Sequence, residues 1–308
     1  MNDPIPLRPK SPPPFPVPRP ARFARTPPAV FPVILGLLGL GLALKRTLGT
    51  LGLDAGIADA ALGAFTALWG FAVFAYAAKM LRRASVVMDD LRVLPGRTGL
   101  AALSMGGMLV AAELTAFSLT AAKAVLIGSL ALHLVQAVLL VIVLRGSPPE
   151  GRMVTPWTPL ALVLLALTIP VALVIWAISA VQLIRRIPPA PLRPMLVIHL
   201  APASLFASVA ALAGQGALAQ GFAALAFILL LLLLMSARWI TVSGFSVLWG
   251  SFTFPLAACA SALILTGWTV AGVVVLVAAL GVVPVIAWKV LVLWGSGQLA
   301  ARTNAAEA

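Results

Sequence analysis

The stretch Trp249-Gly-Ser-Phe-Thr-Phe254-Pro255-Leu-Ala-Ala lies inside a long apolar run of the chain. A proline inside a membrane helix removes one backbone hydrogen bond and kinks the helix. Lipid cannot replace that bond, so the freed carbonyl must face protein or a water-filled cavity. We therefore expect Pro255 to mark a cavity, and we expect Phe252 and Phe254 to be placed to project into it.

The composition indicates a polytopic membrane protein. Of the 308 residues, 62% are hydrophobic and only 9% are charged, whereas soluble domains carry roughly 25% charged residues. The single cysteine, Cys259, excludes a disulfide within the chain, and no residue cluster has metal-ligand spacing. No GxSxG, P-loop or HExxH pattern occurs. We expect no enzyme, no metal and no other cofactor. A membrane enzyme acting on lipid is a weaker alternative, because acidic and histidine pairs at one depth are nearly absent.

The two ends of the chain differ from the apolar region between them. Residues 1–28 hold eleven prolines and five Lys/Arg, which predicts a disordered, basic cytoplasmic tail. An SH3-type ligand is an alternative. A signal peptide is not expected, because no cleavage site of small residues precedes a short apolar run. We assign residues 29–296 to a transmembrane pore domain and residues 297–308 to a short cytoplasmic tail.

Nine apolar runs divide the transmembrane domain. A helix needs about 20 apolar residues to cross the hydrocarbon core. Eight runs are interpreted as one span each, and they cover residues 29–44, 61–81, 98–117, 121–144, 196–213, 219–237, 244–266 and 269–294. The ninth run, 155–184, is too long for one ordinary span and too short for two, and Pro170 lies in its middle.

The distribution of Lys and Arg decides how the ninth run is interpreted. If this run enters the membrane and returns, eighteen of the 21 Lys/Arg face the cytoplasm and only Lys45, Arg46 and Lys123 lie outside. A single crossing would invert every later assignment. We therefore predict two short helices that meet at Pro170, with one tilted span as the alternative. The chain then has ten helical segments in the cell (inner) membrane, with both termini cytoplasmic. The net charge of +13 is mostly an orientation signal, and no nucleic-acid partner is expected.

Helix breakers alternate along the ten segments. Pro32 and Gly36 fall in segment one, Gly106 in three, Pro170 at the end of five, Pro202 in seven and Pro255 in nine. Segments two, four and eight contain no proline, although Pro284 in segment ten departs from the pattern. Because kinked helices need an interior, polar-accessible environment, we predict five hairpins whose odd-numbered helices surround a central pore. The alternative is that Gly and Pro are simply common in membrane helices.

Three stretches carry a resemblance to a known family. They are Val30-Phe-Pro-Val-Ile-Leu-Gly36 in segment one, Leu192-Arg-Pro-Met-Leu-Val-Ile-His199-Leu-Ala-Pro202 at segment seven, and Phe252-Thr-Phe254-Pro255 in segment nine. In their order and spacing the chain resembles the tellurite-resistance/C4-dicarboxylate transporter family, which includes fungal malate and sulfite exporters and plant slow anion channels. The resemblance covers roughly residues 27–300, apart from the run 155–184.

The resemblance implies a fold and a function. It implies a homotrimer in the lipid bilayer, with one pore per protomer for small inorganic anions or C4-dicarboxylates, and a link to tellurite resistance. It also implies a phenylalanine gate, which corresponds to Phe254, with Phe252 as the second candidate. The family has two full helices where this chain has residues 155–184, a difference on the order of 20 residues. This departure keeps open the alternative of a shortened, non-transporting member with a structural or partner-binding role.

Several polar residues within the spans allow two interpretations. His199, about two turns into segment seven, either faces the pore and makes transport pH-sensitive or bonds a neighbouring helix. Glu113 either relays protons or forms an ion pair with Lys123 at the rim. His133 and Gln136 share one helix face, which favours a contact between helices or subunits. No charged residue lies near the middle of an odd segment, so we expect a pore that selects by size, apolar walls and backbone dipoles.

Overall fold

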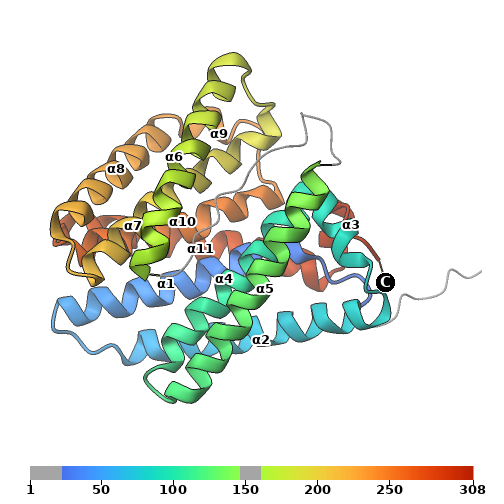
Figure 1. The fold of residues 1–308 in the computed structure, drawn as a ribbon, viewed down its shortest axis with the longest axis horizontal. Helices are drawn as coiled ribbons and strands as arrows, with labels where there is room; N and C mark the ends of the chain where they lie inside the picture. Colours follow the sequence, from blue (N-terminus) through green and yellow to red (C-terminus); the bar gives the residue numbers. More distant parts are fainter. Residues whose placement is uncertain (1–22, 146–160, 308) are drawn as a thin grey trace, which may run out of the picture.

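The computed structural model describes residues 23–145 and 161–307, and these residues form helices and no strand (Figure 1). The α-helices are α1 Phe31–Thr50, α2 Gly56–Arg82, α3 Val86–Arg92, α4 Leu94–Leu114, α5 Leu119–Arg145, α6 Ala161–Arg185, α7 Leu200–Leu212, α8 Gly216–Met235, α9 Ala237–Ile240, α10 Thr253–Leu265, α11 Thr269–Gly295 and α12 Gln298–Thr303. Three 3-10 helices lead into them: η1 Pro28–Val30, η3 Ala190–His199 and η4 Val247–Phe252. In the described residues eight helices are long and apolar enough to cross a membrane, and α3 with α4, bent by 116°, adds a ninth.

The described helices separate into an inner and an outer group. In the apolar windows of η1–α1, η3–α7 and η4–α10, 78, 61 and 67% of the residues are buried, and α4 packs between α1 and α5. The buried share is 17% for α2 and α6, 22% for α5 and α8, and 39% for α11. The inner helices therefore correspond to the predicted segments one, three, seven and nine, which is the alternation that the helix breakers indicate.

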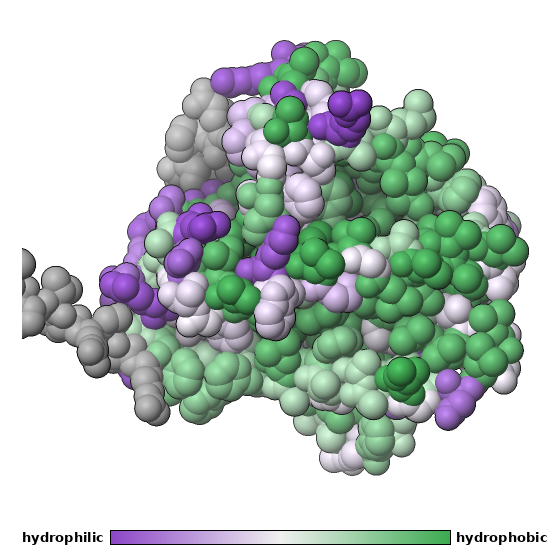
Figure 2. All heavy atoms as spheres, turned by 180° about the vertical axis from the view of Figure 1, so that it is seen from behind, coloured by the Kyte–Doolittle hydropathy of each residue, from purple (hydrophilic) through white to green (hydrophobic). Residues whose placement is uncertain are grey.

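Large apolar side chains cover the outside of the outer helices. Phe74 of α2, Leu134 of α5, Leu234 of α8 and Val274 of α11 are all more than half exposed. Figure 2 shows one face of the molecule, where apolar side chains form most of the surface and hydrophilic ones gather toward one end. Monomeric soluble proteins rarely expose apolar patches of this breadth. The outer surface is therefore suited to lipid, as expected for a multi-pass membrane protein.

The run 155–184 forms a single helix in its described part, so the predicted pair of short helices meeting at Pro170 is wrong. The helix α6 continues through Pro170 to Arg185, and residues 155–160 lie outside the described residues. A proline costs a helix one hydrogen bond and a kink, and membrane helices tolerate that loss when neighbouring groups compensate. With 25 residues, α6 is about 37 Å long, enough for one span. It runs in the same direction as α5, so it takes the place of predicted segment six (Figure 1).

Both described ends of the chain lie at one end of the bundle, which we call the terminal end. Arg25 and Glu307 form an ion pair of 2.7 Å, and the N–H of Ala306 donates to the Asp90 carboxylate at 3.0 Å. The connections from α1 to α2, α4 to α5, α7 to α8 and α10 to α11 lie at the opposite end, which we call the far end (Figure 1). A shared end for both described termini agrees with the predicted placement of both termini on one side of the membrane. The membrane side on which this end lies stays a prediction.

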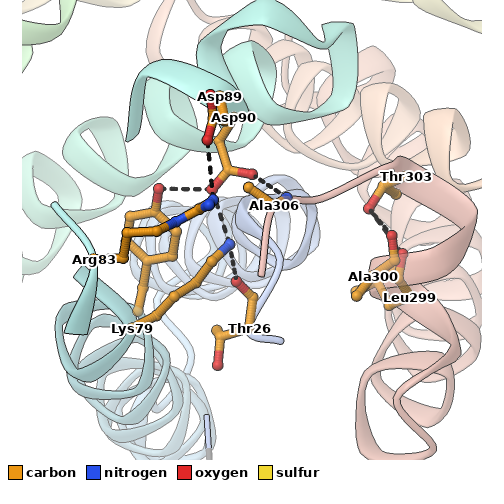
Figure 3. A network of polar contacts seen from close by, with 10 residues as sticks. Thr26, Lys79, Arg83, Asp89, Asp90, Leu299, Ala300, Thr303 and Ala306 are labelled. Atoms are coloured by element: carbon orange, nitrogen blue, oxygen red, sulfur yellow. Dashed lines mark hydrogen bonds and ion pairs between the residues drawn. The ribbon is translucent and has the colours of Figure 1, made fainter. Parts of the chain in front are cut away.

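A buried ion pair holds the terminal end together (Figure 3). The ammonium group of Lys79 on α2 lies 3.0 Å from the carboxylate of Asp90 on α3, and both side chains are fully buried. Lys79 also donates to the carbonyl of Thr26 at 3.1 Å, and the Tyr76 hydroxyl donates to Asp90 at 2.9 Å. This network, together with Ala306, connects α2, α3 and the two described ends of the chain.

Candidate functional site

The four inner helices begin with the same local construction. A short helix precedes α1, α4, α7 and α10, and each of the four then carries a proline in its first turn, namely Pro32, Pro95, Pro202 and Pro255. Proline is tolerated in a first turn, because no intrahelical hydrogen bond is lost there. Pro255 therefore lies at a junction of a 3-10 helix with an α-helix. The prediction that Pro255 kinks one continuous α-helix is therefore wrong.

These four prolines line one cavity of about 100 Å³ near the terminal end. The other lining residues also come from the N-terminal halves of the inner helices and from the short helices before them. The N-terminus of a helix carries a partial positive charge from its macrodipole. Of the four inner helices only α4 begins at such a free end, because the residues just before α1, α7 and α10 are already helical. The N-terminus of α4, where Pro95 and Thr98 line the cavity, therefore favours negative charge there.

Phe254 lines this cavity and extends from it toward the far end, where its ring contacts α1. The lining residues of α1 are Pro32 and Leu35, and Gly39 follows one turn later. A Cβ atom on Gly39 would lie 3.0 Å from the Phe254 ring, so the ring rests directly on the α1 backbone at this glycine. Further along α10, Ala257 and Cys259 are fully buried. The Phe254 ring thus separates the cavity from a packed interior.

The lining of the cavity is almost entirely apolar. Its hydroxyl groups belong to Thr98 and Ser251, and both donate to backbone carbonyls: Thr98 to Pro95 at 3.1 Å and Ser251 to Pro194 at 2.6 Å. The lining residues include no charged side chain. The cavity can therefore hold an anion only weakly, because it has no charged side chain and its two hydroxyl groups already donate to carbonyls.

Two predicted glycines serve helix packing instead of lining the cavity. A Cβ atom on Gly36 would lie 2.2 Å from the Thr253 hydroxyl oxygen, so this glycine allows α10 to approach α1. A Cβ atom on Gly106 would lie 2.7 Å from the indole nitrogen of Trp69 on α2. The sequence identified both positions, but it did not show which neighbour requires them.

Three further predicted residues also lie away from the cavity lining. The Phe252 ring packs against Trp249, with 5.5 Å between the ring centroids. The Nδ1 atom of His199 is buried and has no hydrogen-bond partner in the described part of the chain. Pro170 is exposed on α6. Of the predicted site residues, Pro32, Pro202, Phe254 and Pro255 therefore meet at the cavity, and the others do not.

The other lining residues were missed by the sequence analysis, and Pro95, Met105 and Met195 are examples. Pro95 escaped notice because the expected span began at residue 98, whereas α4 begins at Leu94. Its position after the basic 79–92 segment, in Leu-Pro-Gly, is the signal that could have found it. Met105 and Met195 also line the cavity, and nothing in the sequence distinguishes them from other apolar residues of their segments.

Several polar residues of inner and outer helices find partners on neighbouring helices. Glu113 pairs with Lys45 at 3.0 Å, so the predicted pair with Lys123 is wrong. Lys45 lies closer because α1 and α4 are neighbours in the inner group. The Ser104 hydroxyl on α4 lies 2.9 Å from His133 Nδ1 and 3.0 Å from the Gln136 amide oxygen on α5. The prediction of a contact between helices is confirmed for these two residues.

The inner helices form an arc. In the described residues α1 packs against α4 and α10, and α10 packs against α7, whereas α4 and α7 share no extensive contact. Residues of both α4 and α7 nevertheless line the cavity. Among the described helices the arc is therefore open between α4 and α7, the position that a fifth inner helix would occupy in the predicted ring.

Comparison with known proteins finds no family model that matches the chain and no curated protein similar to it. The resemblance to the tellurite-resistance/C4-dicarboxylate transporter family therefore stays a prediction from the three sequence stretches.

Proposed function

We propose that this protein lets small anions cross a cell membrane through the space between α1, α4, α7 and α10, with Phe254 as the gate. The observation that carries the proposal is the cavity on which four proline-bearing helix starts converge, closed on one side by the Phe254 ring.

The size and lining of the cavity support small anions as the transported species. A cavity of about 100 Å³ holds several water molecules, because one water needs about 10–15 Å³ by the same measure. This is enough for a small inorganic anion or for part of a C4-dicarboxylate. Because the lining residues are uncharged, binding is weak and release is easy, as a channel or low-affinity exporter requires.

The proposal extends to the setting of the protein. We place the chain in the cell (inner) membrane with both termini cytoplasmic, and we propose a homotrimer with one path per protomer. The exposed apolar side chains of the outer helices support contact with lipid or with other protomers. A link to tellurite resistance follows from the same family resemblance.

The gate is tested by anion flux into liposomes, with chloride, nitrate, sulfite and malate offered separately. Replacing Phe254 by Ala removes the ring that rests on Gly39, so we expect Phe254→Ala to raise flux of at least one anion severalfold over the unmodified protein. The matched control is Phe252→Ala, because Phe252 packs against Trp249 and does not line the cavity. Equal flux for both variants and the unmodified protein would refute the gate.

A second function is favoured by one observation, the opening that residues 23–145 and 161–307 leave between α4 and α7. An incomplete ring fits a shortened, non-transporting member that acts by holding another membrane segment in this opening. The flux experiment separates the two proposals. Absence of anion flux for Phe254→Ala in folded, reconstituted protein favours the structural role.

A further inference from the structure

Arg46 has an unusual electrostatic environment near the far end of α1. Its guanidinium group donates a hydrogen bond to the hydroxyl of Ser261 on α10, and the Ser261 side chain is buried. Arg46 itself is partly buried. In the described part of the chain no carboxylate lies within ion-pair distance of Arg46. A guanidinium has five N–H donors, so most of its donor capacity is left for another acceptor.

The neighbouring lysine explains why Arg46 lacks a carboxylate. Lys45 binds Asp59 at 2.8 Å and Glu113 at 3.0 Å, and these are the acidic side chains that α2 and α4 bring to this end of α1. Adjacent residues on a helix point in different directions, so Lys45 faces these acids while Arg46 faces α10. Partly buried charges in proteins are normally paired, and Arg46 is therefore suited to bind an anion that is not part of the chain.

Arg46 and Ser261 lie on the same helix interface as the proposed gate. Arg46 follows Gly39 by seven residues on α1, and Ser261 follows Phe254 by seven residues on α10. Seven residues are two helical turns, about 10 Å, and they return to the same helix face. Both helices run from the terminal end toward the far end. The Arg46–Ser261 pair therefore lies two turns beyond the Phe254–Gly39 contact.

We propose that Arg46 and Ser261 form a binding site for a small oxyanion at the far end of the α1–α10 interface. The planar guanidinium fork is suited to bidentate binding of oxyanions, and the Ser261 hydroxyl supplies a further donor. The bound group is either a free anion or the phosphate of a lipid, because both present the same oxygen atoms. A role of this site in an anion path rests on the proposed function. Its capacity to bind an oxyanion rests only on the geometry of Arg46 and Ser261.

The site is tested by equilibrium binding, which needs no flux. Purified protein in a phosphate-free detergent is titrated with sodium nitrate, and its thermal unfolding midpoint is followed, with sodium gluconate at equal ionic strength as the salt control. We expect nitrate to raise the midpoint in a saturable manner. Arg46→Gln should weaken nitrate binding by about tenfold or more, the loss typical of a hydrogen bond to a charged group.

Two further variants keep the test specific. Lys123→Gln removes the same charge from an exposed position near the same end, so it should leave nitrate binding unchanged. Arg46→Lys keeps the charge but not the fork, so it should bind nitrate more weakly than the unmodified protein. A midpoint that does not respond to nitrate, or an equal response in Arg46→Gln and Lys123→Gln, would overturn the site.

Competition identifies the source of the anion. If inorganic phosphate and a short-chain phosphatidic acid both displace nitrate, the site accepts free oxyanions. Displacement by the lipid alone assigns the site to a lipid headgroup, and either result supports an oxyanion site. If Arg46→Gln abolishes nitrate binding and yet, when added to Phe254→Ala, leaves anion flux unchanged, that result supports the binding site and refutes its place in the anion path. If neither the unmodified protein nor Phe254→Ala conducts anions, while the unmodified protein still binds nitrate, only the proposed function is refuted.

Discussion

Replacing Asp90 by Ala should destabilise the protein more than a change at any exposed ion pair. The Asp90 carboxylate accepts hydrogen bonds from Lys79 at 3.0 Å, from Tyr76 at 2.9 Å and from the N–H of Ala306 at 3.0 Å (Figure 3). The side chains of Lys79 and Asp90 are both fully buried. In Asp90→Ala the Lys79 ammonium group would keep only the Thr26 carbonyl as a partner, and it could not reach solvent.

The expected cost follows from this geometry. Removing one partner of a buried ion pair lowers the free energy of unfolding by about 3–5 kcal/mol, because the remaining charge is left uncompensated. The matched control is the neighbouring residue Asp89, which pairs with Arg83 and Arg92 and is 35% exposed. Exposed pairs contribute about 0–1 kcal/mol, so Asp89→Ala should be nearly neutral.

The measurement is equilibrium unfolding in mixed detergent micelles, followed by tryptophan fluorescence. A double variant, Lys79→Met with Asp90→Leu, removes both charges and should recover most of the stability lost in Asp90→Ala. Two results would refute the reasoning: an Asp90→Ala cost no larger than that of Asp89→Ala, or a double variant as unstable as the single one. Either result would mean that water reaches the pair or that the two described chain ends are not held by it.

Two further predictions concern the helices themselves, and the same unfolding measurement checks both. Gly36→Ala should lower the free energy of unfolding by about 1–3 kcal/mol, because its Cβ would meet the Thr253 hydroxyl at 2.2 Å; Gly70→Ala, with no atom within 4 Å, is the control and should be neutral or slightly stabilising. Pro170→Ala should keep the fold and raise stability, by up to about 3 kcal/mol, because α6 is continuous there; a loss of folded protein would instead favour a turn at Pro170.

The inner and outer helices could be separated from the sequence, and the physical reason is the lipid. The side of a helix that faces hydrocarbon must be apolar, as on α8, and Gly and Pro are concentrated in the helices that pack closely or border the cavity, although the outer helices α6 and α11 also contain Pro170 and Pro284. Pro32, Pro202, Phe254 and Pro255 could therefore be assigned to one site in advance, and the structure places them at one cavity. Gly36 was recognised as a helix breaker, but its role in leaving space for the Thr253 side chain depends on where α10 lies.

The misassigned features have different causes. Two short helices meeting at Pro170 were predicted from the length of the run and from the distribution of Lys and Arg, but neither shows whether a helix continues through a proline. Glu113 was paired with Lys123, which is ten residues away, whereas its partner Lys45 is brought close by the packing of α1 against α4. Pro95 was left outside its span because a hydropathy run does not show where a helix begins.

By itself, the sequence determined that this chain is a helical membrane protein, which helices are inner ones, and that its basic residues favour one end. These properties follow from apolar content, breaker positions and charge, all of which act locally or through the bilayer. Only the tertiary structure decided that four proline-bearing helix starts meet at one cavity, that Asp90 holds both described ends of the chain, and that Arg46 faces Ser261 without a carboxylate. Such contacts join residues up to 216 positions apart, and their formation depends on helix packing in three dimensions, which no local pattern encodes.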